Sequence, residues 1–188
     1  MNFNFILKPK TFFEEISEEK IGLKTPLFVV LSISIFSILN FVIEVFYFNS
    51  PRYGEALIFP FLMKLLGPML LWFLVTSVFS LLSYPLDYVG NFFRLLKFIG
   101  YSFYPIIVFQ ISKTIMILFD PPFLGFNYIS PSSLIRASIL FWLWSGDLWI
   151  YVLETTRDVE LKKSLFSVFL ILLMLFFLLN QEIFALIL

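Results

Sequence analysis

Four ionisable side chains interrupt the longest apolar stretches of this sequence, and the chemistry open to them is limited. They are Glu44, Lys64, Lys113 and Asp147. A carboxylate or an amine in apolar surroundings could line a polar path for transport. It could also lock neighbouring helices together through an ion pair or a hydrogen bond.

Catalysis by these residues is not expected. The chain contains no histidine and no cysteine, so the usual metal ligands and general bases are missing. Gly146-Asp147 is similar to the Gly-Asp pair of intramembrane aspartyl proteases, but that chemistry needs two carboxylates that share a proton. The only candidates for the second acid, Asp87 and Asp120, lie in connecting segments. We therefore predict a protein without enzymatic activity, cofactor or metal.

The composition defines the surroundings of these residues. Hydrophobic residues make up 60% of the 188-residue chain and charged residues 14%, whereas soluble domains carry about 45–50% and about 25%. So little polar surface cannot cover a water-soluble globule, and the lipid bilayer is the expected partner. Acidic and basic residues balance to a net charge of zero, which argues against a nucleic-acid partner.

Five segments are long and apolar enough to cross the bilayer, since a spanning helix needs about 20 mostly apolar residues. They are approximately residues 26–48, 59–82, 98–119, 134–153 and 164–181. We predict an all-α, polytopic five-helix transmembrane bundle over residues 26–188. Residues 1–25 are predicted to form a cytoplasmic leader with a short amphipathic helix that lies on the inner leaflet, with Phe12, Phe13 and Ile16 on its apolar face.

Basic residues near the ends of the spans predict the orientation. One side carries the larger group, Lys8, Lys10, Lys20, Lys24, Arg94, Lys97, Arg157, Lys162 and Lys163. The other side carries Arg52, Lys64, Lys113 and Arg136. The positive-inside rule then places the N-terminus in the cytoplasm, and five crossings place the C-terminus outside.

The first candidate site is a polar cluster in the outer half of the membrane. Glu44, Lys64 and Lys113 fall at about one depth in three different spans, so Glu44 is expected to pair with Lys113 or Lys64. Helical spacing adds neighbours on the same faces, and the predicted cluster is Ser37, Asn40, Glu44, Lys64, Gln110 and Lys113. The alternative is that Glu44 and Lys64 extend separately to the headgroups.

The second candidate site is predicted at the depth of Asp147, in the inner half. Its members are Thr76, Ser80, Tyr101, Tyr104 and Asp147. Pro105 removes a helical hydrogen-bond donor at that level and should kink the third span. Asp147 is expected to meet these hydroxyls, or Arg94 or Lys97, and either locks the bundle or lines a polar cavity.

Several stretches in this order resemble the YIP family, the Ypt-interacting membrane proteins. They are "PKTFFEEISEEK", "KTPLFVV", "GNFFRLLKFIGYSFYP" and "FWLWSGDLWIYVLETTRDVELKKSLFSVFLILL". The most specific part comprises Gly90, Phe93, Arg94, Gly100, Tyr101 and Pro105. The resemblance implies a five-span membrane domain with a cytoplasmic N-terminus and no catalytic residues.

The resemblance also implies something about partners. Eukaryotic members act in vesicle traffic and associate with Rab-type GTPases and with one another, but they carry an acidic-aromatic N-terminal region that is missing here. GTPase binding is therefore not expected, and the short chain suggests a protein of a prokaryotic plasma membrane. We predict a membrane scaffold that binds other membrane proteins or itself. The alternative is a small transporter, channel or lipid-translocating protein that uses the intramembrane polar residues.

Overall fold

The computed structural model describes residues 8–18, 22–47, 57–83, 91–119 and 131–180, and all regular structure in these ranges is helical. The elements are α2 (Pro9–Glu18), α3 (Lys24–Val42) continued by the π-helical turn η1 (Ile43–Tyr47), α4 (Ile58–Ser83), α5 (Phe92–Ser102), α6 (Tyr104–Phe119), α7 (Pro131–Arg157) and α8 (Leu161–Asn180). Each apolar segment coincides with one of these helices, except that α5 and α6 share the third.

Three stretches of the described chain are long and apolar enough to cross a membrane: Lys24–Val45, Ile58–Ser83 and Phe92–Phe119. Their lengths of 22, 26 and 28 residues exceed the roughly 20 that a span requires. The coarse prediction of an all-α protein with several apolar helices is thus confirmed.

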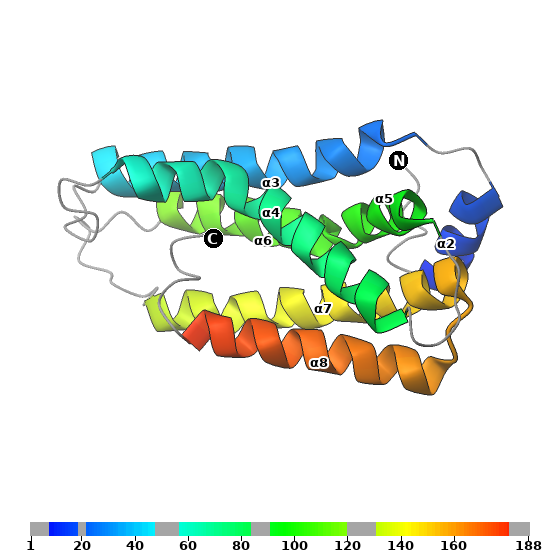
Figure 1. Ribbon diagram of the computed structural model, residues 1–188. Helices are drawn as coiled ribbons and strands as arrows, with labels where there is room; N and C mark the ends of the chain where they lie inside the picture. Colours follow the sequence, from blue (N-terminus) through cyan, green and yellow to red (C-terminus); the bar gives the residue numbers. More distant parts are fainter. Residues whose placement is uncertain (1–7, 19–21, 48–56, 84–90, 120–130, 181–188) are drawn as a thin grey trace.

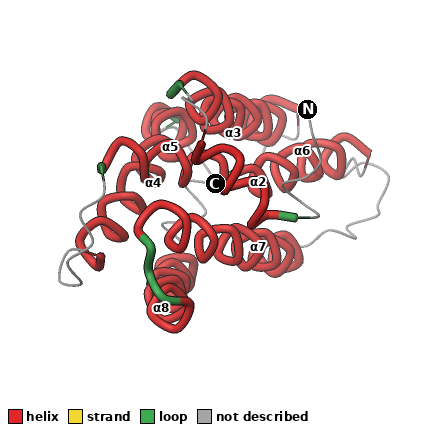
Figure 2. The backbone as a smooth tube through the Cα atoms, turned by 90° about the vertical axis from the view of Figure 1, so that its right-hand side faces the viewer, coloured by secondary structure: helices red, strands yellow, loops and turns green. Residues whose placement is uncertain are grey.

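The long helices lie roughly side by side (Figure 1). Helix α3 packs against α4 and α6, and α7 packs against α8, α5 and α6. Figure 2 shows the bundle from its end, with α7 and α8 on one side and α3 on the other. Aromatic side chains fill the space between them. Phe79 of α4, Phe103 between α5 and α6, and Trp149 of α7 are each at most 1% exposed.

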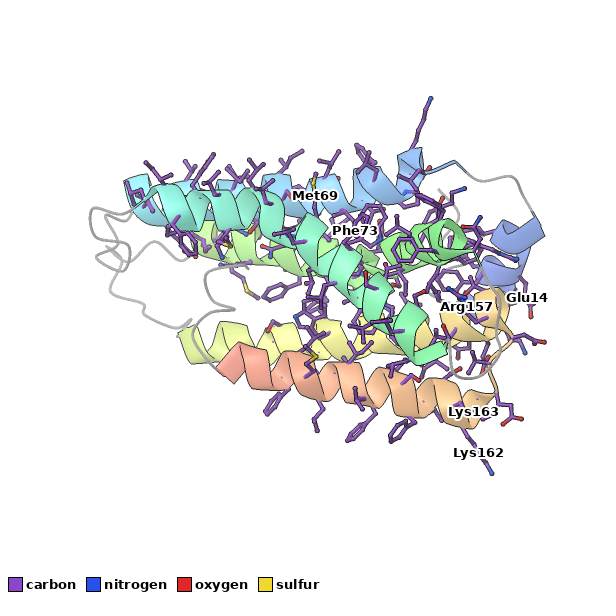
Figure 3. All side chains as sticks on the ribbon, viewed as in Figure 1. Glu14, Met69, Phe73, Arg157, Lys162 and Lys163 are labelled. Atoms are coloured by element: carbon purple, nitrogen blue, oxygen red, sulfur yellow. The ribbon has the colours of Figure 1, made fainter. Side chains whose placement is uncertain are left out.

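Helix α4 changes direction along its length. Its first part runs beside α3, and after Met69 and Phe73 it crosses toward α7 and α8 (Figures 1 and 3). Pro68 lies inside this helix and follows Gly67. Proline removes one backbone donor and its ring obstructs the preceding turn, so a bend at this point is expected.

The third apolar segment is broken at Phe103. Helix α5 ends at Ser102, and α6 begins at Tyr104 with Pro105 in its first turn. The Phe103 amide bonds to the Gly100 carbonyl instead of continuing an α-helical pattern. The kink predicted from Pro105 is therefore present, and the ring of Phe103 lies against the rings of Trp142 and Trp149 of α7.

Three helices meet at Gly100. A Cβ atom on this residue would lie 2.6 Å from Cβ of Pro26 in α3 and 3.2 Å from Cζ2 of Trp72 in α4. The Trp72 indole Nε1 donates a hydrogen bond of 2.8 Å to the carbonyl of Leu96 in α5. Glycine is thus required here because the backbones of α3 and α5 approach more closely than any side chain allows.

The apolar face of α2 packs on the end of the bundle. Phe13 is 1% exposed, and its ring stacks on Phe98 of α5, while Phe12 makes an edge contact with Tyr101. Helix α2 also packs against α7. The aromatic side chains of this face thus pack on an apolar surface at the end of the bundle, and the position of the helix on the inner leaflet stays a prediction.

Candidate functional site: a buried polar cluster and an exposed carboxylate

A chain of side-chain hydrogen bonds joins α3 to α6. The amide Nδ2 of Asn40 donates to Oε1 of Gln110 at 2.9 Å, and the hydroxyl of Thr114 donates to Oδ1 of Asn40 at 2.7 Å. The Thr114 hydroxyl also lies 2.9 Å from the backbone carbonyl of Gln110. Asn40 and Gln110 are at most 1% exposed, so this network is sealed from its surroundings.

An ion pair lies beside this network. Nζ of Lys113 is 3.1 Å from Oε1 of Glu44, with side-chain exposures of 13% and 20%. Glu44 belongs to the π-helical turn η1, which follows α3 directly. Of the two partners that the sequence allowed for Glu44, the structure shows the pair with Lys113.

Lys64 of α4 completes the charged part of the cluster. It is 2% exposed and interacts electrostatically with both Lys113 and Glu44. A lysine that extended separately to the headgroups would not be enclosed in this way. Of the six predicted residues, Ser37, Asn40, Lys64 and Gln110 are buried and Glu44 and Lys113 are partly buried, with Ser37 one turn before Asn40.

Thr114 was missing from the predicted cluster, although it bonds to two of its members. It lies one helical turn after Gln110, so the spacing that selected Gln110 and Lys113 also applies to Thr114. Small hydroxyl residues in apolar helices often bond only to their own backbone, as Ser32 does to Phe28. Spacing alone does not tell these two cases apart.

Asp147 lies elsewhere and in different surroundings. Its side chain is exposed on α7, on the same face as Leu140 and Leu143. Among the described residues the carboxylate has no hydrogen bond or ion pair, and it interacts electrostatically with Tyr151 one turn away. The expectation that Asp147 faces the interior of the bundle is wrong, because the aromatic side chains of α7 occupy that side and turn Asp147 outward.

The other residues of the predicted inner site make separate contacts. The Thr76 hydroxyl donates to the carbonyl of Trp72 in its own helix at 2.8 Å. Ser80 accepts a hydrogen bond of 3.3 Å from Nη2 of Arg157. Tyr101 contacts Phe12, and Tyr104 is half-buried. The structure therefore does not bring these hydroxyls to Asp147.

Arg157 was not among the predicted site residues, although it joins α7 to α4 and is 7% exposed. Its position one helical turn after an apolar span is the signal that could have identified it. An arginine there can lay its apolar stem along the bundle while its guanidinium bonds to a neighbouring helix end.

The described motif residues lie on α5 and at the start of α6. Gly100 and Pro105 are buried at the contacts of α5 described above, and Phe93 is 62% exposed. The guanidinium carbon of Arg94 lies 5.9 Å from the ring centre of Phe98, within the range of a cation–π contact. Gly90 lies outside the described residues.

In the described ranges, no three histidine, cysteine, aspartate or glutamate residues form a group that could hold a metal ion. Within the helices, Glu44 and Lys113 form an ion pair between η1 and α6, and Asp147 lies exposed on α7. The polar contacts of the cluster are of the kind that associates helices in an apolar medium.

Apolar helices with a sealed polar cluster define a multi-pass helical membrane protein. Within this class, the model of the Yip1 domain matches residues 3–180, so the chain belongs to the Yip1 domain family. It is also similar to the uncharacterized protein MJ0794 of Methanocaldococcus jannaschii, at 30% identity over 110 residues, which are 55% of this chain and 78% of that protein. No solved structure matches the chain.

Proposed function

We propose that α3, α4, the α5–α6 pair, α7 and α8 each cross the bilayer, with the N-terminus in the cytoplasm of a prokaryotic cell. The described basic residues that flank the helices support this orientation. Arg157, Lys162 and Lys163 lie at the same end of the bundle as α2 (Figure 3). Lys24 and Arg94 lie at the beginning of α3 and α5, at that end too (Figure 1). Such a bias is typical of the cytoplasmic side.

Cysteine labelling tests this topology, because the natural chain has no cysteine. In intact cells, a membrane-impermeant maleimide should label Leu188→Cys but not Lys8→Cys. After permeabilisation both variants should react, which controls for reagent access. Equal labelling of the two positions in intact cells would contradict an odd number of crossings.

We further propose that the protein is a non-enzymatic scaffold that binds other membrane proteins within the bilayer, in the organisation or traffic of membranes. The observation that carries this proposal is the exposed carboxylate of Asp147. A charged side chain at the centre of a spanning helix costs about 2.5–3.5 kcal/mol, so such residues normally face a polar partner. Here the chain supplies none among its described residues, and a second protein can.

The depth of Asp147 supports this reading. A Cβ atom on the adjacent Gly146 would lie 2.7 Å from Cδ1 of Leu172, so Asp147 is level with the middle of α8. From Ser164 to Asn180 that helix has no charged residue. An aspartate side chain is too short to reach a headgroup from there, unlike lysine or arginine.

The alternative of a transporter receives less support from the geometry. A transport path needs polar groups that are free to bind a substrate, whereas the Asn40, Gln110 and Thr114 side chains bond to one another. Lys113 and Glu44 likewise form a pair. These contacts are typical of groups that hold helices together.

Site-specific photo-crosslinking tests the scaffold. A benzophenone amino acid at Leu143, on the face of Asp147, should give a discrete protein adduct in native membranes. The same probe at Leu70 of α4, which is also exposed and whose described exposed neighbours are apolar, should react with lipid only. Adding Asp147→Leu should remove the adduct at Leu143, because the polar contact that holds the partner is lost.

If Leu143 gives lipid adducts only, as Leu70 is expected to do, the α7 face has no protein partner and the scaffold proposal fails. An adduct that survives Asp147→Leu would leave a partner but remove the carboxylate from its binding. Adducts of similar yield at both positions would indicate unspecific collisions in the membrane.

A further inference from the structure

One face of α7 points away from the rest of the bundle. Leu140, Leu143 and Asp147 are spaced by three and four residues and are all exposed, so they form one stripe along the helix. The half-buried Tyr151 continues this stripe by one turn. We call these four residues the α7 outer face.

The opposite side of α7 is buried. Trp142, Ser145 and Trp149 are at most 3% exposed and lie about half a turn away from the outer face. Gly146 and Leu172 bring α8 against one flank of the helix, and Phe109 of α6 contacts Phe141 on the other. The outer face is therefore the one side of α7 that no described helix covers.

The side chains of the α7 outer face indicate which kind of partner helix would bind there. It offers two leucines for packing and one carboxylate as a hydrogen-bond acceptor. In an apolar medium, an acceptor that carries charge is best matched by a lysine or arginine at the same depth. A partner helix with only apolar residues would exclude lipid but leave the carboxylate unsatisfied.

A second copy of this chain does not provide that match. Two copies inserted in the same direction and related by a two-fold axis would place Asp147 opposite Asp147, and like charges repel. At the depth of Asp147, no exposed side chain of the described residues is basic. The lysines in the middle of α4 and α6, Lys64 and Lys113, belong to the polar cluster.

We propose that the α7 outer face binds a transmembrane helix of a different membrane protein, one that carries a lysine or arginine level with Asp147. The inference rests on the proposed function and adds the chemistry of the partner to it. Charge complementarity across the contact selects this partner over other apolar helices, and the leucines supply the packing surface.

Synthetic helices of known sequence test this inference. The full-length protein, labelled with a donor dye, is reconstituted in phosphatidylcholine liposomes with acceptor-labelled leucine-alanine transmembrane peptides. One peptide has a single lysine at its centre, the second has leucine there, and the third has the lysine two turns nearer one end. Energy transfer at increasing peptide-to-lipid ratio measures the association.

The centred lysine peptide should associate about tenfold more tightly than the leucine peptide, the size expected of one strong polar contact between helices. The displaced lysine should give little of this gain. Asp147→Asn should reduce the preference, and Asp147→Leu should abolish it. Glu160→Gln removes another exposed carboxylate, one that lies at the start of α8, and should leave the preference unchanged.

Three outcomes would overturn the inference. Equal association of all peptides with the wild-type protein would show that the carboxylate does not select a partner. A lysine preference that Asp147→Leu retains would place the binding site elsewhere. Energy transfer between two labelled copies that depends on Asp147, without a lysine preference, would assign the face to self-association.

Because Asp147 is exposed, its variants should fold, and unfolding in SDS mixed micelles checks this.

The failure of this inference is distinguishable from failure of the scaffold. Protein adducts at Leu143 in native membranes, combined with no lysine preference in liposomes, would leave a partner in place but refute its basic residue. The absence of adducts at Leu143 would remove the partner itself.

Discussion

Replacing Gly100 by alanine should cost about 3 kcal/mol or more of unfolding free energy, at the upper end of what an extra methyl group costs in a packed core. The new Cβ atom would lie 2.6 Å from Cβ and 3.3 Å from Cα of Pro26, which belong to the rigid first turn of α3. Neither atom can move without the helix. Alanine is intrinsically better than glycine in a helix by about 1 kcal/mol, which does not offset the clash.

Two other glycines make a graded control for this variant. At Gly146 the added atom meets the end of the flexible Leu172 side chain, so Gly146→Ala should cost far less, with helix propensity offsetting much of it. At Gly22 the nearest atom is 3.9 Å away, so Gly22→Ala should change stability by about 0.5 kcal/mol at most. SDS titration followed by tryptophan fluorescence measures all three. A Gly100→Ala protein as stable as Gly22→Ala would contradict the close approach of α3 and α5.

Removing the carboxylate of Glu44 should be the most damaging single change in the polar cluster, with a loss of about 3–5 kcal/mol. Glu44→Gln leaves Lys113 without its partner at 3.1 Å, and Lys64 then interacts with Lys113 without an intervening acid. Two enclosed like charges repel strongly because the surrounding medium screens them poorly. Lys113→Met should cost less, since Glu44 keeps its interaction with Lys64.

The double variant Glu44→Gln/Lys113→Met provides the decisive comparison. It removes one charge of each sign, so it should be more stable than Glu44→Gln alone, a coupling that a double-mutant cycle measures. The control is the exposed pair of Glu160 and Lys163, 3.7 Å apart, where Glu160→Gln should cost at most about 0.5 kcal/mol. If Lys113→Met proves more damaging than Glu44→Gln, the assignment of Glu44 as the shared partner of both lysines is wrong.

The cluster and the exposed carboxylate divide the polar residues of this Yip1 domain protein into two groups. The cluster joins α3 and η1 to α6 through the hydrogen bonds of Asn40, Gln110 and Thr114 and the ion pair of Lys113 and Glu44, so we expect its variants to change stability first. Asp147 has no hydrogen bond or ion pair among the described residues, so we expect its variants to change association first. Measuring both properties on the same variants separates the two roles.

Composition and hydrophobic length alone were enough to predict the membrane class and the positions of the helices. Runs of about 20 apolar residues have few stable alternatives to a spanning helix, because every backbone group must be bonded within the segment. The same reasoning placed Glu44 and Lys113 at one depth, since helical rise converts sequence distance into depth. The depth of a residue follows from its position within its own helix, so the sequence was enough to predict an ion pair of Glu44.

Direction around a helix axis was decided only by the tertiary structure. Asp147 and Trp149 lie two residues apart in the same apolar segment, and either could have faced the core. Trp142 and Trp149 occupy the side of α7 that faces the bundle, where they pack on Phe103 at the break between α5 and α6. Asp147 therefore lies on the outward side of the helix. When nearly every residue of a span is apolar, hydrophobicity cannot select a face, and the shapes of large side chains against neighbouring helices select it instead.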